Sequence, residues 1–354
     1  MTIYFKKYLP KVLPFLLILI QATSSHAQVN RCALNLAEAQ DKFMSGQIQE
    51  VPRLLIDCIN NGFSYEDRIE AYKLLINAYI FDDNIEMAEQ YMLEFLDNYP
   101  EYVASPDDPV EFVSLFELYD NSPRYSMGFN LGTNITQVDV TEPFGVYNVN
   151  EVSKDYKISP GFSFGGHINF FLKEKVEFSL EPMLVFRNIK YEVNPYSYTR
   201  TEYKENQTRF DLPVSFLYKF SSGPVSPYLR LGATPSFLIG GSAESSRLYT
   251  STGSLTYDDL SGEADNISEQ RTSLNFLAFL GAGLRYELSK SFLFVDVRYN
   301  YALNSMVDPE SRQNLNDNNT WIFYNTQDDF FLNDVMITFG YTKVFYKTKK
   351  VSPY

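Results

Sequence analysis

Residues 292–303 read FLFVDVRYNYAL, and this stretch decides the fold. Apolar and polar side chains alternate along it: Leu293 and Val295 share one face, and Asp296 and Arg298 share the other. Alternation of this kind is the period of a β-strand, because successive side chains of a strand point to opposite faces. The stretch therefore predicts a strand with one apolar and one polar face.

Seven further segments repeat this pattern. Together the predicted strands cover residues 126–135, 161–172, 176–186, 209–220, 228–239, 274–286, 292–303 and 335–345. Three gaps between them are short, at residues 173–175, 221–227 and 287–291, whereas the other four are long, with roughly 20 to 35 residues each. Outer-membrane barrels have short periplasmic turns and longer external loops, so this rhythm predicts an eight-stranded antiparallel transmembrane β-barrel.

The choice of the lipid-facing side follows from size. An eight-stranded barrel has an interior just wide enough to be filled by side chains, whereas its outer surface is larger. The apolar faces are rich in Phe, Tyr and Leu, and the polar faces carry Gly128, Gly132, Gly165, Gly232, Gly281, Gly283 and Gly340. We expect the small residues inside and the aromatic residues against lipid, the reverse of a soluble β-sandwich with a polar outer face.

The same alternation places charged residues inside the barrel. They are Glu177, Glu181, Arg187, Arg209, Asp211, Lys219, Arg230, Arg285, Asp296 and Arg298. Isolated buried charges are costly, so a nearly balanced set predicts an ion-pair network that fills the interior. An ion channel would need a wider ring, although a small-solute channel stays an alternative.

The sequence offers no pattern for catalysis. No Walker loop, dinucleotide fingerprint, zinc-ligand spacing or calcium loop occurs. Barrel enzymes of the outer membrane use His with Asp or Ser at the outer rim, whereas His167, the one histidine after the predicted signal peptide, is expected to face inward as a buried, hydrogen-bonded group. We expect a protein that is not an enzyme and that has no cofactor, metal or catalytic residue.

The N-terminus has the pattern of a secretory signal peptide. Lys6, Lys7 and Lys11 precede or flank an apolar run at residues 12–20, and Ala27 ends a plausible cleavage site. The apolar run is too short to cross a bilayer as a helix, which needs about 20 residues. We therefore expect a signal peptide at residues 1–27 and export to the outer membrane.

Residues 28–122 have helical periodicity instead. Helices are predicted at residues 33–45, 49–60, 65–81, 85–98 and 109–119. Residues 45–51 and 82–88 align at a distance of about 37 residues, close to the tetratricopeptide period of 34. The segment resembles two divergent tetratricopeptide-type hairpins, which favours either a module that binds a peptide or protein partner or a spacer that packs on the barrel.

Charge and cysteine content add two expectations. Residues 28–125 hold 19 acidic and 6 basic side chains, which argues against nucleic acid and is compatible with a basic protein partner or simply a solvated surface. The two cysteines of the chain, Cys32 and Cys58, both lie in the helical part, and its first two predicted helices would be antiparallel neighbours. A disulfide between them is expected in an exported protein and would stabilise it by roughly 3 kcal/mol.

The barrel segment also resembles a known family. Residues 178–184 (FSLEPML), 210–214 (FDLPV), 227–233 (PYLRLGA), 281–284 (GAGL) and 295–299 (VDVRY), with Gly340 and Tyr341 near the end, are similar to the PorT-like outer-membrane β-barrel family. The resemblance covers about residues 125–346 and implies an eight-stranded barrel in a Gram-negative outer membrane. The founding member of that family takes part in type IX secretion, and the family offers no functional residues to carry over.

These observations predict a domain order and a function. We expect a periplasmic helical domain at residues 28–122, a barrel in outer-membrane lipid at residues 123–346 and a periplasmic tail at residues 347–354. The helical domain is expected to dock a periplasmic protein in a secretion or envelope-assembly complex. The alternative is a surface-facing barrel whose long loops bind an extracellular ligand or surface.

Overall fold

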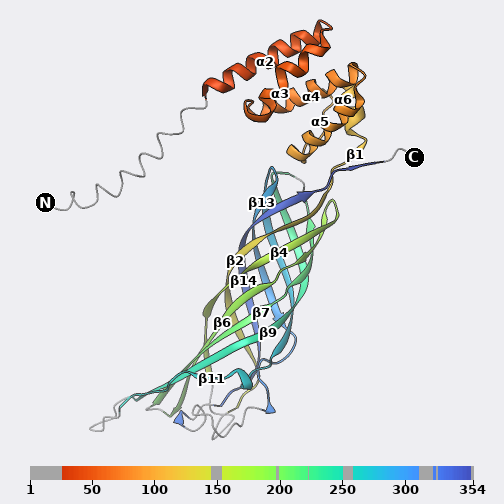
Figure 1. Cartoon of the computed structure of the whole chain (residues 1–354). Coiled ribbons are helices and arrows are strands. Elements are labelled where there is room, and N and C mark those ends of the chain that lie inside the picture. The colour runs from red at the N-terminus through yellow and green to blue at the C-terminus, as the bar shows by residue number, and fades with distance from the viewer. Residues whose placement is uncertain are drawn as a thin grey trace, which may run out of the picture. The chain divides into compact units, whose positions relative to one another are not determined.

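The structure is a computed structural model that describes residues 26–144, 154–196, 199–221, 223–249, 258–310, 322–323 and 326–351. The chain divides into two compact units, a helical unit of Met1–Ser122 with Tyr346–Tyr354 and a barrel unit of Pro123–Phe345 (Figure 1). The predicted signal peptide lies outside the described residues except for His26 and Ala27, which begin the first described helix.

The helical unit contains the helices that the periodicity predicts. They are α2 (His26–Met44), the 3-10 turn η2 (Ile48–Glu50), α3 (Val51–Asn61), α4 (Tyr65–Phe81), α5 (Ile85–Asn98) and α6 (Val110–Phe116). The predicted bounds hold within two residues for α3, α4 and α5. Helix α2 begins earlier than predicted, and α6 is shorter because a two-residue strand, β1 (Tyr119–Asp120), follows it.

The two helical hairpins turn in the same way. Gly46 follows α2 with a φ of +79°, and Asp83, 37 residues later, follows α4 with a φ of +58°. In both turns the backbone N–H of the next residue donates to a carbonyl five residues earlier, that of Lys42 or Tyr79, at 2.9 Å. Glycine and aspartate suit these positions because they tolerate the left-handed conformation better than most residues do. The internal repeat is therefore a repeat of backbone geometry.

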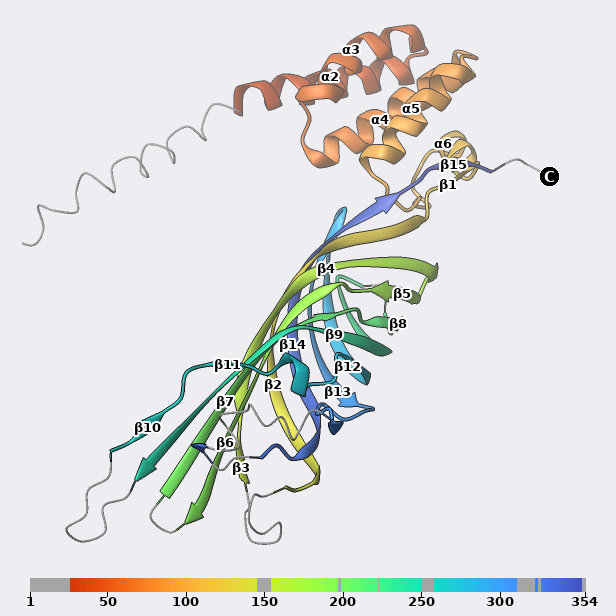
Figure 2. The same ribbon diagram turned by 60° about the horizontal axis from the view of Figure 1, so that its bottom comes forward.

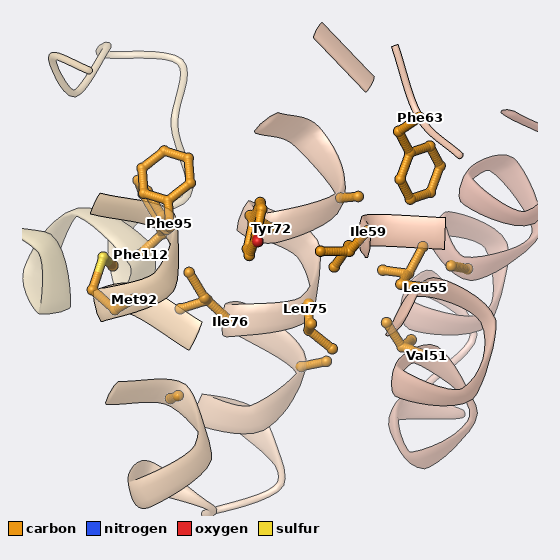
Figure 3. Close-up of a cluster of buried hydrophobic side chains, with 14 of the residues drawn as sticks. Val51, Leu55, Ile59, Phe63, Tyr72, Leu75, Ile76, Met92, Phe95 and Phe112 are labelled. Atoms are coloured by element: carbon orange, nitrogen blue, oxygen red, sulfur yellow. The ribbon is translucent and has the colours of Figure 1, made fainter. Parts of the chain in front are cut away.

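Helix α4 packs against α2, α3, α5 and α6 and forms the centre of the helical unit. Apolar side chains from four helices meet there, as Figure 3 shows for Val51, Leu55, Ile59, Phe63, Tyr72, Leu75, Ile76, Met92, Phe95 and Phe112. The hydroxyl group of Tyr72 donates to Glu94 at 2.8 Å, so the polar end of this buried ring is satisfied. Burial of these apolar groups supplies the main stabilisation of the unit.

A disulfide joins the first two helices. Cys32 on α2 and Cys58 on α3 are bonded, with their Cα atoms 5.6 Å apart. Gly62, just after α3, lies so close to the bridge that a Cβ atom at this position would overlap the sulfur of Cys32. The bridge and this glycine together fix the approach of α2 to α3.

The end of the chain, predicted as a periplasmic tail at residues 347–354, groups with the helical unit. Strand β15 (Lys349–Lys350) pairs with β1, and the N–H of Val351 donates to the carbonyl of Leu118 at 2.7 Å. Lys350 also forms an ion pair with Glu89 on α5 at 2.5 Å. The helical unit is thus completed by residues that follow the last strand of the barrel.

The barrel unit is a closed antiparallel ring (Figure 1). Its long strands are β2 (Pro123–Glu142), β4 (Ser159–Lys173), β5 (Val176–Leu180), β6 (Met183–Tyr196), β7 (Thr199–Asp211), β8 (Val214–Lys219), β9 (Val225–Tyr249), β12 (Leu274–Leu288), β13 (Ser291–Ala302) and β14 (Asp329–Tyr346). Strands β5 and β6 occupy one position in the ring and β8 and β7 another, so the described residues form eight positions, closed by pairing of β12 with β9 and of β14 with β2.

Prolines cause both interruptions. Pro182 separates β5 from β6, and Pro213 separates β7 from β8. Proline has no N–H to donate to the ladder, which weakens the pairing at these two positions. Both carbonyls still accept, that of Pro182 from the N–H of Gly166 at 3.0 Å and that of Pro213 from Glu181 at 2.9 Å, which keeps the ring continuous.

The prediction of a long loop at residues 187–208 is wrong. Strands β6 and β7 run through it and stay paired from Arg187↔Gln207 to Tyr196↔Thr199, and β9 continues to Tyr249, ten residues past its predicted end. Three short strands, β3 (Lys154–Lys157), β10 (Leu260–Ser261) and β11 (Asp265–Asn266), pair with this extension. We call this part of the barrel unit the extended end, and Figure 2 shows β6 and β7 reaching into it. The opposite end, where short turns join β4 to β5, β8 to β9 and β12 to β13, is the short-turn end.

The faces of the strands are distributed as the sequence predicts. On β13, Leu293 and Val297 are each 48% exposed, whereas Asp296 and Arg298 are each 1% exposed. Apolar side chains thus point out of the ring and charged side chains point in. At Gly128 on β2 an added Cβ would overlap the backbone of β14, so close strand approach requires glycine at this position.

Candidate functional site

Nine of the ten predicted interior charges are buried inside the ring, and the tenth, Lys219, has a side chain that is 14% exposed. At the short-turn end, Glu177 on β5 pairs with Arg285 on β12 at 2.6 Å and with Lys219 on β8 at 3.5 Å. The guanidinium of Arg285 lies 3.8 Å from the centroid of the Phe292 ring, a cation–π contact. One carboxylate therefore links three strand positions across the interior.

The middle of the ring holds two carboxylates and two guanidinium groups. Arg230 pairs with Asp296 at 2.6 Å and also with Glu181, whereas Arg298 pairs with Glu181 at 2.9 Å and with Asp296 at 3.3 Å. The hydroxyl of Tyr228 donates to Asp296 at 3.2 Å. Each charge here has two partners of opposite sign, so the group is neutral and needs no counterion.

A third layer lies nearer the extended end. Arg187 on β6 bridges two carboxylates, Asp211 on β7 at 2.8 Å and Asp334 on β14 at 3.2 Å. Asn300 donates to Asp334 at 2.5 Å. This layer fastens β14 to the opposite wall of the ring.

Two interior residues have neutral partners. The guanidinium of Arg209 donates to Asn275 at 2.6 Å and to Ser236 at 2.8 Å, and it forms no ion pair with any described residue. His167 is 4% exposed and bonds Thr342 through Nε2 at 2.8 Å. Arg209 was predicted to join the ion-pair network, whereas its place in the structure is a cage of amide and hydroxyl oxygens.

The prediction missed three members of the network. Asp334 precedes the last predicted strand by one residue, and Glu205 and Arg271 fall in predicted loops. Arg271 pairs with Glu205 at 2.5 Å and also donates to Gln327 at 2.9 Å, in the extended end. Burial alternates along β7 through Glu205, but the sequence of this strand has polar residues on both faces and so gave no signal for it.

Beyond the charges, an apolar cluster lies on the inner faces of the extended strands. It comprises Ile189, Tyr191, Val193, Tyr203, Ala243, Ile267, Met306, Val307, Phe330 and Leu332. Beside the cluster, Lys154 and Asp328 form a buried ion pair at 2.5 Å. Segments between β9 and β12 and between β13 and β14 thus fold inward, and side chains occupy the interior from the short-turn end to this cluster.

The helical unit has a hollow of about 270 Å³ on its surface, which we call the α4 groove. It is lined by Gln40 and Phe43 of α2, by Glu70, Lys73, Leu74, Asn77 and Phe81 of α4, and by Pro109 and Glu111 at the start of α6. The α4 residues recur every three or four positions and so share one face of that helix. Asn77 is 3% exposed, and its Oδ1 atom accepts no hydrogen bond from the described residues.

A buried charge cluster shapes one wall of the groove. Lys73 pairs with Asp108 at 2.7 Å and with Glu70 at 2.8 Å. Burial lowers the pKa of Lys73, but its bonds to the two carboxylates outweigh this effect and raise the pKa above its usual value. Burial likewise raises the pKa of Asp108, but hydrogen bonds from Lys73, Tyr102 and the N–H of Ser105 dominate and lower it. The pair stays charged at neutral pH and fastens the segment before α6 onto α4.

Two further properties concern the described part of the chain as a whole. Nowhere in it do three or more His, Cys, Asp or Glu side chains gather in a way that would hold a metal ion. None of its helices has both the length and the apolar character that crossing a bilayer requires.

Comparison with known families agrees with a strand ring whose apolar side chains point outward and whose charged side chains point inward. Residues 119–308, more than half of the chain, match the profile of the family described as outer membrane protein beta-barrel domain. The chain belongs to this family. The predicted outer-membrane barrel is thereby confirmed, and outer-membrane lipid is its environment. No curated protein sequence matches the chain.

This outer-membrane barrel is also similar to solved structures. OprG from Pseudomonas aeruginosa is 9% identical with a TM-score of 0.37, and the match covers 64% of this chain and 97% of that chain. Neisserial surface protein A is 13% identical with a TM-score of 0.29 (62% and 97% covered). Ail, the attachment invasion locus protein of Yersinia pestis, is 12% identical with a TM-score of 0.27 (62% and 99% covered). None of these values supports an inference about what this protein binds or does.

The outer surface of this outer-membrane barrel changes character along β7 and β9. Phe210 and Phe237 are exposed on the outward faces, as lipid-facing side chains must be. Further along the same faces, Lys204 on β7 pairs with Glu244 on β9 at 3.3 Å, with both side chains about half exposed. Because charged side chains on a lipid-facing surface are destabilising, we place the end of the apolar belt between these two levels, with the extended end in water.

Proposed function

We propose that this outer-membrane protein is not an enzyme, that its barrel anchors the helical unit, and that the helical unit docks a protein partner in the periplasm. The observation that carries the proposal is the α4 groove, a surface hollow of about 270 Å³ that is lined by Phe43 and Phe81 and by the acidic Glu70 and Glu111.

The strand count and the loop lengths support the proposed side of the membrane. An even number of strand positions leaves both ends of the barrel on one side, which is also the side of the short turns. In outer-membrane barrels the short turns are periplasmic. This supports a periplasmic helical unit and an extended end on the cell surface.

The family resemblances support the same role. The repeated turns at Gly46 and Asp83 are what two tetratricopeptide-like hairpins require. The sequence motifs of the barrel resemble those of the PorT-like family, whose founding member acts in type IX secretion. We therefore place the partner in a secretion or envelope-assembly complex.

A deletion tests the docking role. In cells, the full chain and a variant that lacks residues 28–120 are crosslinked, purified and compared for the proteins that come with them, after equal outer-membrane levels of both have been verified. We expect periplasmic partners to be lost from the deletion variant. A control variant, Lys204→Ala on the extended end, keeps them. Unchanged partners in the deletion variant would sink the proposal.

The second candidate function is binding at the cell surface. The observation that favours it is the length of β6, β7 and β9, which carry the barrel wall beyond the apolar belt with charged outward faces. A membrane-impermeant amine reagent applied to intact cells should label Lys204 but not Lys350, which we place in the periplasm. Protection of Lys204 and labelling of Lys350 would reverse the orientation.

The alternative of a small-solute channel has its own test. Because paired charges and the apolar cluster occupy the interior, we expect no sustained large conductance from the protein in planar bilayers. Such a conductance would show that the barrel acts as a channel and would contradict its proposed role as an anchor only.

A further inference from the structure

We propose that the outer face of the extended end binds the phosphorylated sugar headgroup of a membrane glycolipid. The proposal does not depend on the docking function, and it adds a ligand site to the barrel unit. Three features carry it: a row of lysines in register, a neutral polar hollow beside this row, and the position of both at the edge of the apolar belt.

The lysine row crosses three neighbouring strands. Lys157 on β3 lies directly opposite Lys190 on β6, and Lys190 lies directly opposite Lys204 on β7. All three side chains are exposed on the outward face, and Figure 2 shows the three strands in the extended end. Like charges directly opposite one another destabilise a sheet. An anion bound at the row offsets this repulsion.

The two outer lysines of the row have partners within the chain. Lys157 pairs with Asp155 and lies 4.0 Å from a carboxylate oxygen of Glu192. Lys204 pairs with Glu244 on β9 at 3.3 Å. These contacts hold the two outer ammonium groups in place beside the centre of the row.

The central lysine has no such partner. Within the described part of the chain, Lys190 forms no ion pair and no side-chain hydrogen bond. The carboxylates of Glu192 and Glu202, one row farther from the belt, are held by Arg200 at 2.7 and 3.2 Å. A phosphate that approaches from the belt therefore meets Lys190 before it meets these carboxylates. The ammonium group of Lys190 can donate charge-assisted hydrogen bonds to its oxygens.

A hollow of about 430 Å³ lies beside the row, on the side of the belt. Asn206, two positions before the belt-side Thr208 on β7, lines it together with Asn266 on β11, and all of its lining residues are uncharged. Its floor is held by a hydrogen bond at 3.0 Å from the N–H of Gly241 to the hydroxyl of Ser268. Amide and hydroxyl groups both donate and accept, as sugar hydroxyl groups do. The hollow therefore suits a sugar, whereas the lysine row suits a phosphate on that sugar.

Both features lie where the outer surface leaves the apolar belt. The outward side chains of β7 run from Phe210 in the belt through Thr208 and Asn206 to Lys204. Lipid acyl chains cover the belt, so their headgroups begin at the level of the hollow and the row. A glycolipid thus places its sugar and phosphate against these residues while its chains contact the barrel. In the orientation proposed above, this lipid is in the outer leaflet.

Native mass spectrometry of the full chain in a non-ionic detergent without phosphate tests the proposal. The probes are diphosphoryl lipid A, phosphatidylglycerol, which has chains and a phosphate but no sugar, and glucosamine 1-phosphate, which has no chains. We expect lipid A to bind about tenfold more tightly than either of the others, because it alone contacts the belt, the hollow and the row. Its affinity should fall as salt is added.

Variants locate the binding. Lys190→Gln should weaken lipid A binding about fivefold, the effect of one basic residue at an anionic lipid surface. Without lipid A, this variant should unfold at the same or a higher urea concentration, because it removes a contact between like charges. Lys173→Gln, at an exposed position at the end of β4 in the short-turn end, is the matched control and should bind as the natural chain does. Asn206→Leu should weaken binding of lipid A but not of phosphatidylglycerol.

Each part of the proposal can fail separately. Unchanged affinity of Lys190→Gln for lipid A would overturn the lysine row as the phosphate site. Equal binding of phosphatidylglycerol and lipid A would overturn the sugar site in the hollow, and equal binding of glucosamine 1-phosphate would show that the ligand is not a lipid. A heparin oligosaccharide that displaces lipid A at a lower concentration would assign the row to a soluble polysaccharide and overturn the glycolipid.

Discussion

The barrel unit and the helical unit apply the same rule of burial to opposite solvents. In the helical unit, Leu75 and Phe95 are completely buried and acidic side chains cover the surface. In the barrel unit, Phe237 and Leu293 face outward while Arg298 and Asp296 are buried. Lipid takes the apolar face of each strand, so the polar face is left to build the interior, and it does so with charges in pairs. The difference teaches that buried charged side chains can fill the interior of this barrel where charges of opposite sign neutralise them.

The largest effect should come from breaking that packing in the barrel. Asp296→Ala removes a carboxylate shared by Arg230 and Arg298, and loss of one partner of a buried pair costs about 3–5 kcal/mol. Equilibrium unfolding in urea, with the protein in lipid vesicles, measures this cost. As a control, Asp139→Ala at an exposed position on β2 should change stability by less than about 0.5 kcal/mol. Equal stability of the two variants would show that the interior charges are hydrated rather than paired.

The disulfide should matter next, and only in the helical unit. Replacing both Cys32 and Cys58 by Ser opens a loop of 26 residues, which should cost about 3 kcal/mol in the chain-entropy model. Hydrogen exchange of the full chain, read by mass spectrometry, should be faster in α2 and α3 than in the natural chain. Exchange in the barrel strands should be unchanged. Reductant on the natural chain should reproduce the pattern. Faster exchange in the barrel as well would mean that the two units do not unfold separately.

Removal of the chain end should have a smaller effect. Truncation after Tyr346 removes β15 and the hydrogen bond from Val351 to Leu118, and at 0.5–1.5 kcal/mol for each hydrogen bond the helical unit should lose about 1–2 kcal/mol. Exchange of peptides from α6 and β1 reports the loss. The single change Lys350→Ala removes only an exposed ion pair and should leave exchange unchanged. Identical exchange in the truncated and natural chains would mean that the β1–β15 pairing does not persist in solution.

The smallest effect is a pH dependence of the helical unit. The pKa of Asp108 is lower in the folded state than in the unfolded chain, so its contribution to stability is fully present above the unfolded pKa of about 3.9 and is lost as pH falls through the folded pKa. Urea unfolding followed by circular dichroism at 222 nm, where the helices dominate, should therefore show a lower midpoint at pH 3 than at pH 6. Asp108→Asn should reduce this difference, and an undiminished difference would assign it to other carboxylates.

Alternation was enough to predict the ring and most of its interior. On β13, the position of Asp296 relative to Leu293 fixes which way each side chain points, because the period of a strand is two. The same logic failed beyond Arg187, where Lys204 and Glu205 put charge on both faces of β7 and concealed the alternation. Pairing with β6 and β9, rather than hydrophobicity, makes that segment a strand.

The α4 groove could not be predicted from the sequence. Asn77 lies on a helix whose central position was not evident, and its neighbours in the groove come from α2 and from the start of α6. Only the packing of these three elements shows that the amide is buried without a donor. Helical periodicity predicts where a helix is, but it does not predict which polar group a second helix will enclose.

The place of the last residues in the helical unit imposes an order on biogenesis. The helices are synthesised and exported first, yet their final strand pairing needs Lys349 and Lys350, which follow every strand of the barrel. A chain that stops short of residue 349 therefore cannot complete its own helical unit. The helical unit, which is made first, is thus completed by residues that are made after every strand of the barrel.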